Sequence, residues 1–102
     1  MPVYKLRYFF DYGSGRCLWA ANEEARERFD YAVGFDALNL PFEVQSVGVR
    51  LLQRYDSSLD WDNPAGPSLW SDHDWANFYR DAEQFLEQVR ACLGTDFEIK
   101  AK

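Results

Sequence analysis

The feature that most constrains the fold is a stripe of apolar residues at helical spacing between residues 72 and 93. Its members are Trp75, Phe78, Tyr79, Ala82, Phe85, Leu86, Val89 and Leu93. Steps of three and four residues place these side chains on one face of an α-helix, and charged and amide side chains occupy most of the other face. The sequence therefore predicts an amphipathic helix over 72–93 whose apolar face packs against a core.

The boundaries of this helix carry their own signals. Ser71 can accept a hydrogen bond from a free N–H of the first turn, and Asp74, three residues later, can return one to the backbone of Ser71. Gly94 can adopt the positive φ that often ends a helix. The helix is therefore expected to begin after Ser71 and to end before Gly94.

The first twenty residues predict a hairpin. In residues 3–12, side chains expected to face the core alternate with side chains expected to face outward, and many of them are aromatic, which indicates a β-strand. Gly13, Ser14 and Gly15 can form a tight turn. Residues 16–20 would then form the second strand of the hairpin. We expect the core face to carry Tyr4, Leu6, Tyr8 and Phe10 on the first strand and Cys17 and Trp19 on the second. A shift of one residue would invert the second set. On the outer face we expect Lys5, Arg7, Arg16, Lys100 and Lys102, with Phe9 and Leu18.

The remaining chain predicts helices and a closing strand. Asn22 can cap a short helix ending at Phe29, and Pro41 fits the start of a second long helix that ends near Asp56. We expect residues 31–40 to form a connector and residues 97–102 to form a closing strand. The predicted fold is a single α+β domain over residues 1–102. It has a three-stranded, mainly antiparallel sheet, one face of which is covered by two long helices and one short helix.

Charge and composition exclude several function classes. The net charge of −6 argues against a general nucleic-acid binder, whose affinity comes largely from neutralising phosphates. No apolar run approaches ~18 residues, so no membrane span is predicted. The first residues are too charged for a secretory signal, which makes a cytoplasmic location the expectation. Cys17 and Cys92 match no metal motif or disulfide framework, and we expect both to be buried free thiols.

The segment 56–75 is the first candidate site. Its carboxylates, with the lone histidine, could in principle hold a divalent metal through Asp60, Asp62 and His73. The spacing fits neither a calcium-binding loop nor a zinc motif, because Pro64 stands where a third ligand belongs and His73 has no partner four residues on. We expect no metal and no cofactor, and these carboxylates are more simply helix-capping and solvated groups.

Two further candidates are surfaces. Trp61 and Trp70 flank a loop broken by prolines and a glycine, and they can either pack over the helices or contact a partner. Lys5, Arg7 and Arg16 on the outer sheet face can either be solvated or bind an anionic partner. These five residues are our candidate contact residues.

No motif for a nucleophile, a phosphate-binding loop or a dinucleotide is present. The leading hypothesis is a cytoplasmic, non-catalytic protein–protein interaction module, such as an adaptor, an inhibitor or an immunity-type protein. Its acidic 56–74 segment and basic sheet face would select the partner by charge. The alternative is a small ligand-binding protein or metal-dependent enzyme that uses the loop 56–75. A third hypothesis is a homodimer that forms through the aromatic residues of segment 56–75 or through an edge of the sheet.

Overall fold

The computed structural model describes residues 2–101 and has an α+β fold. Its elements, in chain order, are β1 (Tyr4–Tyr8), β2 (Leu18–Ala20), α1 (Glu23–Phe29), β3 (Ala32–Val33), a 3-10 turn (Asp36–Leu38), α2 (Phe42–Ser57), α3 (Asp72–Leu93), a second 3-10 turn (Gly94–Asp96) and β4 (Phe97–Ala101). Lys102, which we expected on the outer sheet face, lies outside the described residues.

The longest helix, α3, has the boundaries that the sequence predicts. The Ser71 hydroxyl accepts from the backbone N–H of Asp74 at 3.2 Å, and the Asp74 carboxylate accepts from the backbone N–H of Ser71 at 3.0 Å. This reciprocal pair satisfies donors that the first turn leaves free. At the other end Gly94 has a φ of 76°, which a residue with a side chain rarely adopts.

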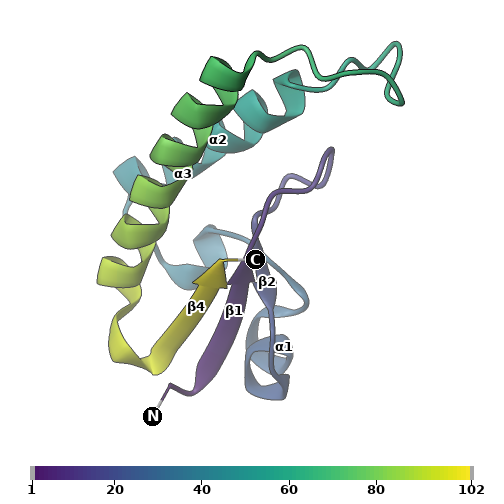
Figure 1. Cartoon of the computed structure of the whole chain (residues 1–102). Helices are drawn as coiled ribbons and strands as arrows, with labels where there is room; N and C mark the ends of the chain where they lie inside the picture. The colour runs from purple at the N-terminus through teal and green to yellow at the C-terminus, as the bar shows by residue number, and fades with distance from the viewer. Residues whose placement is uncertain (1, 102) are drawn as a thin grey trace.

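The sheet differs from the prediction in its size and in one pairing. It has four strands in the order β3-β2-β1-β4, and β1 pairs in parallel with β4, so the expected three-stranded, mainly antiparallel sheet is wrong in detail. The parallel pairing arises because α3 carries the chain back to the end of the sheet at which β1 begins (Figure 1). Only two residues make up β3, which is too short for alternation to reveal.

The hairpin register also corrects the prediction. Leu6 lies opposite Ala20 and Tyr8 opposite Leu18, so Leu18 and Ala20 share the core face. Trp19 lies opposite Arg7 on the outer face, where its ring stacks on Phe9 with centroids 5.0 Å apart. The strands stop at Tyr8 and restart at Leu18, so a long loop replaces the expected tight turn, and alternation before the loop could not fix the pairing after it.

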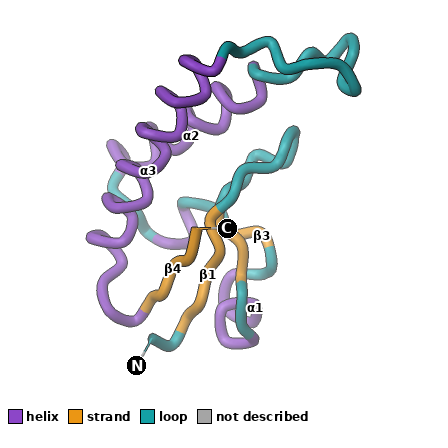
Figure 2. Tube along the Cα trace, in the orientation of Figure 1, coloured by secondary structure: helices purple, strands orange, loops and turns teal. Residues whose placement is uncertain are grey.

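The core lies between the sheet and the helices: α1 packs on β1 and β2, α3 packs beside β4, and α2 packs mainly on α3 rather than directly on the sheet. Phe78, Phe85 and Val89 of α3 are at most 1% exposed, as are Leu6 and Leu18 from the sheet. Figures 1 and 2 show α2 and α3 running side by side and continuing beyond the sheet, with the loop that joins them at the far end. The molecule is accordingly elongated, with extents of 42 × 22 × 22 Å.

The two cysteines have different environments. Cys17 is fully buried, and burial raises the pKa of its thiol to about 12. Cys92 is exposed, so the expectation that both thiols are buried is wrong for this one. Cys92 lies in the last turn of α3, beyond Val89, which is the last buried residue of this helix. Among the described residues, no helix is both long and apolar enough to cross a membrane.

Candidate interaction surfaces

The loop between α2 and α3, residues 58–71, is fixed at its base by the hairpin loop 9–17. The Tyr12 and Ser58 hydroxyls are 2.9 Å apart, and the backbone N–H of Gly13 donates to the Asp56 carboxylate at 3.0 Å. The Tyr12 ring stacks on Tyr55 with centroids 4.3 Å apart. A surface carried by this loop is therefore held by contacts from a segment more than forty residues away in the sequence.

Trp61 is the exposed aromatic residue of this loop. Its side chain is 55% exposed, although its indole N–H donates to the backbone carbonyl of Asp56 at 2.9 Å. Its ring meets Tyr12 edge-on at 6.3 Å. The polar atom of the indole is thus satisfied within the protein, while much of the ring stays open to solvent, which suits a contact with a partner.

Trp70, the second tryptophan that the sequence singled out, is half buried. Its ring lies 4.7 Å from that of Trp75 and 5.4 Å from that of Phe78. A residue that precedes the helix cap and packs on the first turns fixes the angle at which the chain enters the helix. Trp70 therefore holds the end of the loop against α3, and the two tryptophans have different environments.

The acidic residues of the segment do not converge on a metal site. Within residues 2–101, no group of three or more His, Cys, Asp or Glu side chains is arranged to hold a metal ion. Asp60 accepts from the backbone N–H of Asp62 at 3.1 Å, while hydrogen bonds from Ser71 lower the pKa of Asp74 below its usual value. His73 is exposed on the first turn of α3. Asp60, Asp62 and His73, the residues of the metal-dependent alternative, are therefore not brought together as a metal site among the described residues.

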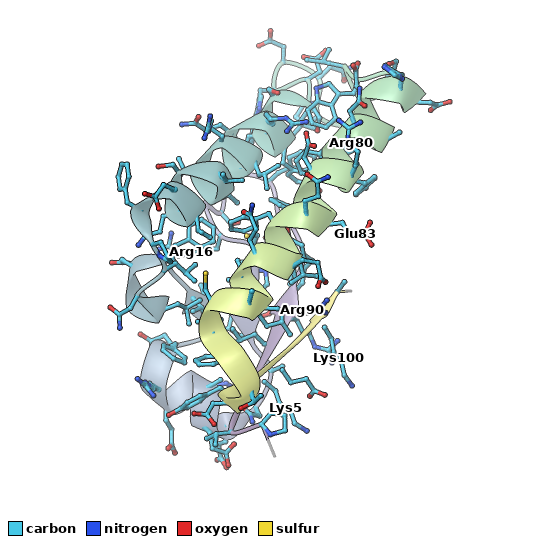
Figure 3. The ribbon with its side chains drawn as sticks, turned by 90° about the vertical axis from the view of Figure 1, so that its left-hand side faces the viewer. Lys5, Arg16, Arg80, Glu83, Arg90 and Lys100 are labelled. Carbon is cyan, nitrogen blue, oxygen red and sulfur yellow. The ribbon has the colours of Figure 1, made fainter. Side chains whose placement is uncertain are left out.

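The basic residues of the sheet do not all lie together. Lys5 and Arg7 are exposed on the outer face, where Arg7 lies opposite Lys100 of β4, and Lys5 is 4.0 Å from Glu98. Figure 3 shows Arg16 well apart from Lys5 and Lys100. Arg16 lies within the hairpin loop 9–17, and its guanidinium is near Gly34. The basic sheet face therefore comprises Lys5, Arg7 and Lys100 among the described residues.

A groove that the sequence did not single out separates α3 from the ends of β1 and β4. Its volume is about 650 Å³. Its lining comes from the sheet and hairpin (Tyr8, Phe9, Phe10, Ala101), from α2 (Tyr55) and from α3 (Tyr79, Ala82, Glu83, Leu86, Glu87, Arg90). Tyr79 belongs to the apolar stripe of α3 but is 60% exposed. The sequence pattern placed Tyr79 with the core residues, so no signal in the sequence pointed to this groove, and only the structure shows that the ring is exposed.

The comparisons with known proteins place the chain in a family. A family model described as Serratia CdiI immunity protein-like matches residues 4–101, which spans every strand and helix described above. A search of curated proteins gave no match. Because the family match covers nearly the whole fold, the chain belongs to the Serratia CdiI immunity protein-like family.

Proposed function

We propose that this protein is an immunity protein that neutralises a protein toxin by binding it, without chemistry of its own. The observation that carries the proposal is the family match over residues 4–101. It favours one member of the three classes that the sequence left open, the immunity-type protein, over an adaptor or a general inhibitor. The cell that makes the toxin would be protected because the complex keeps the toxin from its target.

Two surfaces support recognition of a partner by charge and by aromatic contact. The loop 58–71 presents the exposed ring of Trp61 among carboxylates, and no lysine or arginine occurs between residues 56 and 74. The outer sheet face presents Lys5, Arg7 and Lys100. Opposite charges at separate places favour one orientation of the partner over others. In this proposal Trp61 contacts the toxin, and Trp70 supports the loop from beneath.

The test is protection of growth. The toxin domain from the strain that encodes this chain is induced in a host cell with and without the immunity protein, and growth is followed. Protection together with a 1:1 complex of the purified proteins is the expected result. A chain that neither relieves growth arrest nor binds the toxin domain would overturn the proposal.

Trp61→Ala tests the contact assignment. A central aromatic contact typically contributes about 1–2 kcal/mol or more to binding, so we expect a loss of affinity of roughly tenfold. Phe42→Ala is the matched control, because Phe42 is also exposed, at 82%, but begins α2 away from the loop. Equal affinity of the Trp61 variant and the parent protein would remove Trp61 from the interface.

A further inference from the structure

The groove beside α3 has an apolar floor that the rest of the protein holds rigid. Leu86 is 4% exposed and Tyr8 is 7% exposed. The Tyr8 hydroxyl donates to the backbone carbonyl of Ala82 at 2.8 Å, which ties the sheet directly to α3 under the groove. Phe10 packs edge-on against Phe78 at 5.0 Å. A preformed apolar hollow of this kind can receive side chains without a prior rearrangement.

The rim of the groove carries one charge that stays unpaired within residues 2–101. Three charged residues line the groove, and two of them satisfy each other, because Arg90 donates to the Glu87 carboxylate at 2.6 Å. Arg90 also donates to the backbone carbonyl of Ile99. Glu83 is exposed and forms no ion pair with another described residue. Figure 3 shows Glu83 and Arg90 on the side where α3 borders the end of β4.

The groove is lined by residues that border both surfaces of the proposed interface. At one end Tyr55 lines it, and Tyr55 stacks on Tyr12, which touches Trp61. At the other end it is lined by Ala101, the residue after Lys100. A partner that contacts the tryptophan loop can therefore also reach the groove, because the two share the Tyr12–Tyr55 contact.

From these observations we infer that the groove receives a protruding segment of the partner toxin that carries an apolar side chain beside a lysine or an arginine. This inference rests on the proposed function. The apolar side chain lies on Tyr8, Phe10 and Leu86, and the cation reaches the Glu83 carboxylate. The exposed ring of Tyr79 at the rim can cover the aliphatic stem of that basic side chain. The net charge of −6 favours the approach of such a cationic segment.

The experiment compares rim variants in binding to the purified toxin domain that the wild-type chain neutralises. Glu83→Lys and Tyr79→Ala are each expected to weaken binding roughly tenfold or more. Glu27→Lys is the matched control, since Glu27 is an exposed residue of α1 and its replacement makes the same change in net charge. The control should bind like the wild type, and thermal melts should show that all three variants are folded.

A milder variant keeps the test valid if a substitution at the rim disturbs folding. Glu83→Gln removes only the charge, so it should make binding less sensitive to added salt than binding by the wild type. If the wild type binds and protects but these variants bind equally well, the inference falls and the proposed function stands. If the wild type itself does not bind the toxin domain, both the inference and the proposed function are rejected. Self-association of the wild type that Glu83→Lys abolishes would assign the groove to a second copy and overturn the inference.

Discussion

The substitution Gly48→Ala tests how tertiary packing changes the effect of a glycine within a helix on stability. Gly48 lies within α2, and in an open helix Gly→Ala stabilises by roughly 1 kcal/mol because glycine has the greater freedom in the unfolded chain. Here Gly48 is buried. A Cβ atom at this position would lie 2.6 Å from the Phe35 ring and 2.7 Å from the Phe85 ring. Both distances are shorter than carbon atoms can approach, so both rings, or the helix that carries Gly48, must move.

The size of the effect depends on how easily each ring can move. Phe85 is 1% exposed and packed inside the core, whereas Phe35 is only half buried and can shift toward solvent. Extra atoms in a packed site cost about 1–3 kcal/mol, which exceeds the propensity gain of roughly 1 kcal/mol. We therefore expect Gly48→Ala to lower the free energy of unfolding by about 1 kcal/mol.

Urea unfolding followed by circular dichroism measures this change. A matched cycle adds Phe35→Leu, which removes the ring atoms that lie 2.6 Å from the new Cβ. In that background Gly48→Ala should be less destabilising, although the contact with Phe85 remains, and the difference gives the coupling energy between positions 35 and 48. Stabilisation by Gly48→Ala in the parent protein, or an effect that Phe35→Leu leaves unchanged, would refute the reasoning.

Three further substitutions test the core, the helix cap and one ion pair. Phe85→Ala should lower the free energy of unfolding by about 3–5 kcal/mol in the same urea experiment, and a loss of a few tenths would mean that the stripe is not core. Ser71→Ala should lose about 1 kcal/mol, with Ser57→Ala as the exposed control. The hydrogen bond from Arg54 lowers the pKa of Asp81, so this pair stabilises the protein above the ordinary aspartate pKa and loses its effect as the pH falls through the lower, folded value. Asp81→Asn should therefore melt below the parent at neutral pH, and the two melting temperatures should converge once the pH falls below the lowered pKa of Asp81.

The sequence by itself determined the elements whose signals are local. The helical spacing of apolar residues and the capping residues predicted α3 from 72 to 93. Asn22 predicted the start of α1, and the two-residue alternation of side chains predicted strands near residues 4 and 97. The α+β class followed from these elements. Among the proposed site residues, the sequence singled out Trp61 because it is a large ring beside a loop broken by prolines; the structure leaves this ring 55% exposed, and its contact with a partner stays a proposal.

Only the tertiary structure decided the features that depend on distant segments. The strand order and the parallel pairing of β1 with β4 depend on the path of α3, and the face of Trp19 depends on a register set across a nine-residue loop between β1 and β2. The groove exists because α3 passes the ends of two strands that are over ninety residues apart, Tyr8 and Ala101. A local sequence pattern shows which face of a helix or strand is apolar. It does not show which other element covers that face, because the favourable free energy of burial arises only when segments distant in the sequence pack together and exclude water.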